Sequence, residues 1–528
     1  EWRDLVHEQG RSELTGSRQY AFKHILIRDA AYETLPRATR QALHQRAGDW
    51  LAAAAGARVD DYVGPLAHHA VQAGEPEKAV HYLVAGADRA NRAAAHRREA
   101  ALLAQAIELA EQTPAVVDLV GDLRVRRGRS FVRVGAWAEA RAELERALND
   151  LPAAAERRRG EALADLAQCA FWMMDTPGVR RFAGQAAAVI EGHDDLRLAA
   201  HAMLANADSA DGEVELAIKK SRAVIAEARA RGIEPPYTRL NALPLQLYLT
   251  GESHEAINVS REAVAKARSV AEPAAAMWQF PQLAMALAAV GRYAEATEVF
   301  AEARRFGEEY EVTTVIPRAV AMSAGFRLDL FDYAGAQSIQ EEARELALSA
   351  GFPPTVNSAG IDLLLNLARQ GELGQAERLV RELGPAIEGA GGWHGWLWKL
   401  RFTQAQAELA LADGDGEAAA THAMSAIEQS VAKLRRKYQL LGRTTLGLAL
   451  AAMGRKADGI AELNRAAGLA EELENPALVV RVAAARVSVD DDVDTSAAIA
   501  TIDAIVAELD DADGKRFLDS EPARALMR

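Results

Sequence analysis

A short pattern that recurs along most of this chain places the strongest limit on its fold. In nine segments a turn residue is followed, five positions later, by a small residue. The turn residue is Gly74, Gly135, Gly212, Gly251, Gly291, Gly371, Gly414 or Gly454, with Phe331 in the one exception. The small residue is Ala79, Ala140, Ala217, Ala256, Ala296, Ala336, Ala376 or Ala419, with Gly459 in the last copy. From Gly212 to Gly454 successive turn residues stand 39, 40, 40, 40, 43 and 40 positions apart. The chain therefore repeats with a period of about 40 residues.

Each repeat is predicted to be a pair of helices joined at the turn residue. Glycine takes the left-handed conformation that ends one helix and reverses the chain. The small residue lies one turn into the next helix, where a bulky side chain would push the two helices apart. In the helix after Gly291, the apolar residues Tyr293, Ala296, Phe300 and Ala303 fall on one face at helical spacing. A stack of such pairs is an all-α solenoid.

This arrangement resembles tetratricopeptide repeats, although those have a shorter period of about 34 residues. HEAT-type helix pairs share the longer period, but the recurring turn signature favours a tetratricopeptide-like solenoid. Copies before Gly212 are less regular. Gly74 and Gly135 stand 61 residues apart, and a degenerate unit near Asp175 fills the gap between Gly135 and Gly212.

Composition agrees with an all-α fold and limits the class of function. The chain has 528 residues, of which 50% are hydrophobic and only 6% aromatic, and its formal net charge is −14. Nucleic-acid binding needs clustered Lys and Arg, so no nucleic-acid partner is expected. The short basic runs at 126–133, 157–159 and 433–437 are interpreted as solvated helix faces. One cysteine and no long apolar run predict a cytoplasmic protein without a membrane segment.

The opening stretch, residues 20–51, differs from the repeats. Phe22, Ile25, Leu26 and Ala30 suit one face of a short helix that Pro36 would end. The stretch resembles the junction that follows the winged-helix region of bacterial STAND or AAA-type signal-transduction ATPases. The residues that carry this resemblance are Phe22, His24, Arg28, Asp29, Tyr32 and His44.

The resemblance implies a parent protein larger than this chain. Such proteins carry an ATPase upstream, often after a class III adenylate or guanylate cyclase domain, and some end in a LuxR-type DNA-binding domain. This sequence has no GxxxxGK[ST] phosphate-binding loop, so ATP is expected only on an upstream domain, and no cofactor is expected here. The paired His68 and His69 point in different directions on a helix, so no metal site and no catalytic residue is predicted.

Four parts are predicted on this basis. Residues 1–58 would form the end of a winged-helix-like module, and 59–150 the irregular first repeats. Residues 151–488 would form the regular solenoid, and 489–528 a C-terminal helical cap. The expected function is that of a non-catalytic regulatory solenoid, the sensor arm of an ATPase or cyclase, which binds a protein, a peptide or a small effector. A free-standing tetratricopeptide scaffold and part of a LuxR-type regulator are the alternatives.

A tryptophan cluster is the best sequence indication of a ligand site. Trp393 and Trp396 share helical spacing with Leu397 and Leu400, which predicts a core stripe. Trp398 lies off this stripe, where it would either pack internally or face a groove and stack on a ligand. Trp393, Trp396 and Trp398 are therefore the candidate binding residues.

Overall fold

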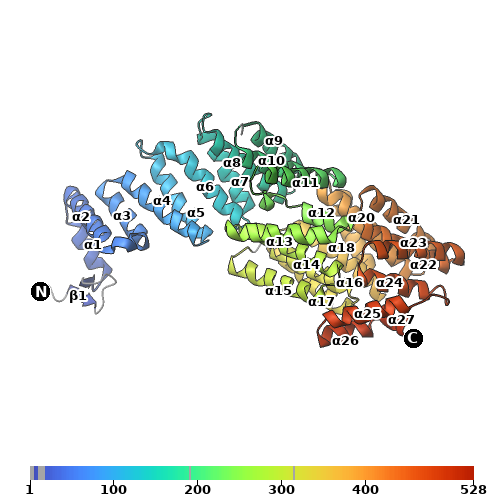
Figure 1. Ribbon diagram of the computed structural model, residues 1–528. Helices are drawn as coiled ribbons and strands as arrows, with labels where there is room; N and C mark the ends of the chain where they lie inside the picture. Colours follow the sequence, from blue (N-terminus) through green and yellow to red (C-terminus); the bar gives the residue numbers. More distant parts are fainter. Residues whose placement is uncertain (1–4, 10–17, 190–191, 313–314) are drawn as a thin grey trace. The chain divides into compact units, whose positions relative to one another are not determined.

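The computed structural model describes residues 5–9, 18–189, 192–312 and 315–528, and helices dominate them (Figure 1). The chain opens with the strands β1 (Val6–Gln9) and β2 (Gln19–Phe22). The helices that follow up to the middle of the chain are α1 (Ile25–Glu33), α2 (Arg37–Ala55), α3 (Val63–Ala73), α4 (Pro76–Arg92), α5 (His96–Glu111), α6 (Val120–Arg133), α7 (Trp137–Asp150), α8 (Glu156–Trp172), α9 (Thr176–Val189), α10 (Asp194–Ala210), α11 (Val214–Ala230), α12 (Leu243–Thr250) and α13 (Ser253–Ser269). The remaining helices are α14 (Pro273–Ala289), α15 (Tyr293–Glu309), α16 (Ile316–Asp329), α17 (Tyr333–Ser349), α18 (Pro353–Gln370), α19 (Leu373–Glu388), α20 (Gly392–Ala412), α21 (Gly416–Ala432), α22 (Arg436–Ala452), α23 (Lys456–Glu472), α24 (Pro476–Val487), α25 (Ser496–Glu508), α26 (Asp511–Asp519) and α27 (Glu521–Met527).

The chain forms two compact units. Unit 1 comprises Glu1–Phe131 with Ala138–Ala162, and unit 2 comprises Val132–Trp137 with Leu163–Arg528. The four parts described from the sequence stay a prediction.

The predicted helix pairs are present, and the turn signature has its expected geometry. Each of the eight signature glycines has a positive φ, between 75° and 95°. Phe331, the exception, also has a positive φ of 61°. The small residues that follow are buried at the helix crossings. A Cβ added to Gly459 would lie 2.6 Å from the carbonyl oxygen of Gly447, so only glycine fits at the close crossing of α22 and α23. The prediction of an α-solenoid is therefore confirmed.

The start of unit 1 corrects one sequence prediction. β1 and β2 pair in antiparallel fashion, with Val6 opposite Phe22. Phe22 thus belongs to a strand and not to the helix face predicted for it. The helix α1 starts at Ile25, and its apolar residues Ile25 and Leu26 are 63% and 77% exposed. Their spacing correctly indicated a helix, but within the described residues these side chains are not buried against any other part of the chain.

Unit 2 winds so that repeats distant in sequence touch. α10 contacts α20, and α12 contacts α22. Lys433 donates a hydrogen bond from Nζ to the carbonyl oxygen of Gly212, 3.1 Å away and 221 positions earlier in the chain. Lys437 forms an ion pair with Asp329 of α16. The first helices of successive repeats therefore surround a common interior, which α14 shows most clearly because all its residues are buried.

No helix in the described part of the chain is long and apolar enough to cross a membrane.

Candidate ligand-binding cavity

A cavity of about 190 Å³ lies inside unit 2. Its lining comes almost entirely from the first helices of six successive repeats, α12, α14, α16, α18, α20 and α22. Because each of these helices contributes its inward face, the cavity is formed by residues that lie far apart in sequence. Tyr248 of α12 and Tyr438 of α22 line it together, for example.

Five cationic side chains line this space, and three of them have carboxylate partners. Arg369 binds both carboxylate oxygens of Glu408, at 2.6 and 2.9 Å. Arg401 pairs with Asp362 and also donates from Nη1 to the hydroxyl of Ser358 at 2.7 Å. Lys437 pairs with Asp329. Burial opposes these charges, but Asp362 and Asp329 outweigh burial and raise the pKa of Arg401 and Lys437.

The other two cations, Arg318 and Arg435, have no carboxylate partner among the described residues. Arg318 donates from Nη1 to the carbonyl oxygen of Trp278 at 3.1 Å, and its guanidinium carbon lies 3.6 Å from the centroid of the Trp278 ring. Arg435 is 4% exposed, and its Nη1 has no hydrogen-bond partner in the described structure. Its guanidinium carbon lies 5.3 Å from the Tyr438 ring centroid.

Burial weakens the charge on both unmatched arginines without removing it at neutral pH. It lowers the pKa of Arg318 to about 9 and that of Arg435 to about 10, and the nearby Arg401 contributes to the lowering at Arg435. Both guanidinium groups therefore stay protonated at pH 7. The cavity holds two positive charges that the protein itself does not neutralise.

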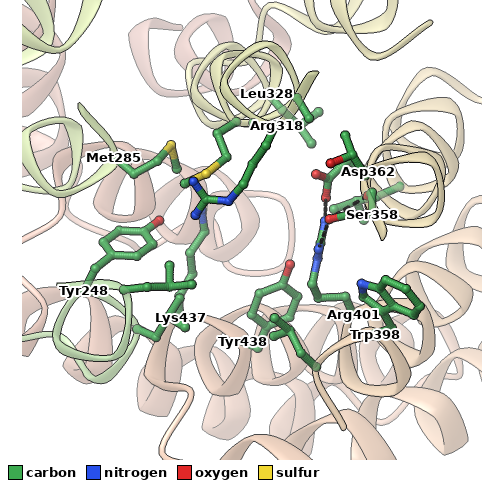
Figure 2. A pocket seen from close by; sticks show the side chains of 18 of the residues that line it. Tyr248, Met285, Arg318, Leu328, Ser358, Asp362, Trp398, Arg401, Lys437 and Tyr438 are labelled. Carbon is green, nitrogen blue, oxygen red and sulfur yellow. Dashed lines mark hydrogen bonds and ion pairs between the residues drawn. The ribbon is translucent and has the colours of Figure 1, made fainter. Parts of the chain in front are cut away.

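Aromatic side chains and polar groups share the cavity wall. Figure 2 shows Arg318 reaching into the space between Tyr248 and the Arg401–Asp362 ion pair, with Tyr438 below it in this view and Trp398 next to Arg401. Burial raises the pKa of the Tyr248 phenol, so its hydroxyl remains a hydrogen-bond donor at neutral pH. The arrangement suits recognition of an anion by fixed donors, with rings to hold an apolar group.

The three candidate tryptophans have different positions. The side chain of Trp393 lies outside the described residues. Trp396 is half-buried and packs against Ala210, Ala242 and Leu397. Trp398 is only 6% exposed, so it does not lie on an open groove, but its side chain forms part of the cavity lining. Internal packing and contact with a ligand are therefore compatible for Trp398.

The junction residues lie in unit 1, and the structure brings only some of them together. The Tyr32 hydroxyl lies 2.9 Å from Nε2 of His44, whose Nδ1 lies 2.8 Å from Nδ1 of His69. Arg28 pairs with its neighbour Asp29 at the surface. His24 precedes α1 as its N-cap without a capping side-chain hydrogen bond, and Phe22 ends β2.

Sequence reasoning missed the unmatched arginines. The run at 433–437 was interpreted as a solvated face, and this is wrong for Arg435 and Lys437, which line the cavity. A usable signal was present in α16, because Arg318 is a charged residue within a first helix that is otherwise largely apolar near its start. Among the described residues, no three His, Cys, Asp or Glu side chains are arranged to hold a metal ion.

Comparisons with known proteins support the fold. No protein-family model and no curated protein sequence matches this chain. A crystal structure of Rap protein complexed with Competence and Sporulation Factor matches 67% of this chain and 99% of its own, with a TM-score of 0.53 and 12% identity. The fold is a tetratricopeptide-like solenoid.

Two further solved structures resemble this chain less closely. One is the Cut9–Hcn1 hetero-tetramer of the APC/C, with 15% identity, 94% of this chain and 98% of that chain covered, and a TM-score of 0.41. The other is a STAND protein with a tetratricopeptide repeat sensor from Pyrococcus horikoshii, with 12% identity, 78% and 67% covered, and a TM-score of 0.44.

Proposed function

We propose that this chain is a non-catalytic regulatory solenoid that binds an anionic ligand in the cavity of unit 2. The observation that carries the proposal is the pair Arg318 and Arg435, a half-buried and a buried cation that have no carboxylate partner among the described residues. A buried charge without a partner destabilises a fold by several kcal/mol. An anion bound between such groups would recover that energy through charge-assisted hydrogen bonds.

The position of the cavity supports a regulatory role. Its lining joins first helices from six repeats, and α10 and α12 contact α20 and α22 across the interior. A ligand that contacts several of these helices would favour the winding in which they are close together. Such differential contact is what a ligand needs in order to shift a conformational equilibrium.

The proposal places this solenoid in the cytoplasm, as the sensor arm of a larger signal-transduction ATPase or nucleotide cyclase. Its support is the junction motif together with the apolar side chains that the first module leaves exposed. Ile25, Leu26 and Trp50 are 63%, 77% and 54% exposed, which suits packing against a further domain. ATP would bind that upstream domain and not this chain.

The anion site is tested by thermal unfolding of the full chain in chloride and in phosphate buffer. Phosphate stabilises proteins generally, so the wild type is compared with the double variant Arg318→Met/Arg435→Met. The matched control is Arg304→Met, which removes an exposed arginine paired with Glu308 and Glu342. We expect phosphate to raise the unfolding midpoint of the wild type and the control more than that of the double variant. An equal rise in all three proteins would contradict an anion site.

The sensor-arm assignment has a separate test. An antibody against this chain would be used to measure the intact mass of the native protein in its source cells. A mass well above that of this chain supports an arm of a multidomain protein, whereas a mass equal to it favours the free-standing scaffold.

A further inference from the structure

A second cavity of about 190 Å³ adjoins the cationic one. Its described lining contains no ionisable side chain. α8, α9 and α10 contribute two residues each, including Phe171, Trp172 and Val179, and α14, α18 and α20 contribute one each. The two cavities share five lining residues, including Trp278 and Trp398. We refer to them as the cationic chamber and the apolar chamber.

Trp278 forms the partition between the two chambers. Arg318 covers its ring from the cationic side, with the guanidinium carbon 3.6 Å from the ring centroid. The Trp172 ring meets it edge-on from the apolar side, with centroids 4.3 Å apart and planes at 87°. The indole nitrogen of Trp278 donates to the carbonyl oxygen of Asn241 at 2.9 Å, which fixes the ring in place.

The apolar chamber is itself held by stacked rings. Trp172 lies parallel to Trp137, with centroids 4.8 Å apart and planes at 7°, and Phe171 contacts Trp278 edge-on. Rings locked in this way leave a preformed apolar space that needs little ordering when a ligand enters. Engineered apolar cavities of about 150 Å³ hold a benzene molecule. The apolar chamber is therefore large enough for one ring-sized group.

We infer that the ligand of this solenoid is an amphipathic organic acid, with its acid group in the cationic chamber against Arg318 and Arg435 and a ring-sized apolar group in the apolar chamber. This inference rests on the proposed anion site and adds the chemical class of the ligand. The acid group is a carboxylate or a phosphate, since guanidinium forks bind both. Trp278 and Trp398 line both chambers and would contact the link between the two parts of the ligand.

The test uses calorimetric titration of the full chain with four small probes. The probes are 3-phenylpropionate, propionate, 3-phenylpropanamide and phenyl phosphate. Burial of one phenyl group predicts that 3-phenylpropionate binds at least about tenfold more tightly than propionate. The amide has the same ring without the charge and is expected to bind at least about tenfold more weakly than the acid. Comparison of 3-phenylpropionate with phenyl phosphate shows which acid group the chamber prefers.

Two kinds of variant assign the parts of the ligand to the chambers. Arg435→Met is expected to weaken the binding of 3-phenylpropionate and of propionate. The exposed control Arg304→Met should leave the affinity for both unchanged. Thr176→Phe places a ring into the apolar chamber from a half-buried position at the start of α9. It should abolish the advantage of 3-phenylpropionate over propionate without weakening propionate.

The outcomes separate this inference from the proposed function. If 3-phenylpropionate and propionate bind with equal affinity and Arg435→Met weakens the binding of both, the anion site stands and the apolar chamber has no role. If the amide binds as tightly as the acid, the anion site itself is wrong. If neither aryl acid binds at about 10 mM, where a contribution of even a few kcal/mol would be detected, both proposals fail.

Discussion

The guanidinium carbon of Arg318 lies over the ring of Trp278, 3.6 Å from its centroid, and Nη1 of Arg318 donates to the carbonyl oxygen of the same residue at 3.1 Å. One residue thus provides both the cation–π contact and the hydrogen bond that hold a half-buried positive charge without a carboxylate. Such contacts stabilise a cation by less than a paired carboxylate does. Arg318 can therefore still bind an anion, and the proposed function depends on this.

The first prediction concerns the stability of the ligand-free chain. Arg435→Met removes an unmatched buried charge, so we expect the free energy of unfolding to stay the same or rise by about 1–2 kcal/mol. Arg401→Met is the matched comparison, because it leaves Asp362 without its cation. It should lower the free energy of unfolding by about 3 kcal/mol. Urea denaturation measures both, and equal losses for the two variants would show that Arg435 has a partner in the ligand-free protein.

The second prediction concerns the turn signature. Ala296 is fully buried at its helix crossing, and Ala296→Leu should destabilise unit 2 by about 1–3 kcal/mol through overpacking. Ala301→Leu makes the same change on the exposed face of the same helix, α15, and should be nearly neutral. Thermal unfolding of the two variants decides the point. Similar midpoints for both would mean that the small residue is not required by helix packing.

The third prediction isolates the contact that joins distant repeats. Gly212 and Gly414 share a φ of 83°, so alanine costs about 1 kcal/mol of backbone strain at either position. At Gly212 a Cβ would also lie 2.8 Å from Nζ of Lys433 and 3.1 Å from the Trp396 ring, whereas nothing lies within 4 Å at Gly414. Gly212→Ala should therefore destabilise more than Gly414→Ala and should alone alter ligand affinity. Equal effects in denaturation and titration would show that the contact of Gly212 with Lys433 and Trp396 is not needed.

The fourth prediction concerns pH and unit 1. Burial lowers the pKa of His44 and His69 below the ordinary value of 6.5. His68 and Arg40 add to the lowering at His44, and His44 and His68 add to it at His69. Below pH 6.5 the unfolded chain therefore binds more protons than the folded one, and stability falls as pH decreases from 6.5 through the folded pKa values. Above pH 6.5 these groups contribute no pH dependence.

Thermal unfolding at pH 7.5, 6.5 and 5.5 measures this effect. The hydrogen bond between the two Nδ1 atoms needs one of them unprotonated, so it is lost when both rings become charged. His69→Asn should reduce the loss of stability between pH 6.5 and 5.5, whereas the exposed His254→Asn should not. A pH response that His69→Asn leaves unchanged would contradict this origin.

The local parts of the fold were predictable because they depend on local rules. A glycine with positive φ and a small residue one turn later are requirements of a single helix pair, and the sequence displays both. The conformation of Phe331 could not be predicted from these local rules. It takes a positive φ in place of glycine, and its ring stacks on Phe517 of α26, with centroids 5.7 Å apart. That packing depends on the C-terminal helices, which no pattern around position 331 indicates.

The cavity was harder to predict because it depends on the winding of the whole unit. Arg435 belongs to a short basic run that is indistinguishable from a solvated helix face in sequence. Its burial results from the return of α20 and α22 to the side of α10 and α12. Trp398 was identified as a candidate, but its position inside a chamber rather than on an open groove follows from the same winding. The helical period assigns a face to each residue, but it does not determine what covers that face.

The most direct test of the account is anomalous diffraction from crystals of the full chain soaked in sodium iodide. Iodide is a single anion that scatters strongly and binds exposed or buried cations without needing a shaped site. We expect an iodide ion inside the cationic chamber, in contact with the guanidinium groups of Arg318 or Arg435. A chamber without iodide, with a protein carboxylate such as Asp329 or Asp362 turned onto those arginines, would contradict the central claim that their charge is left for a ligand.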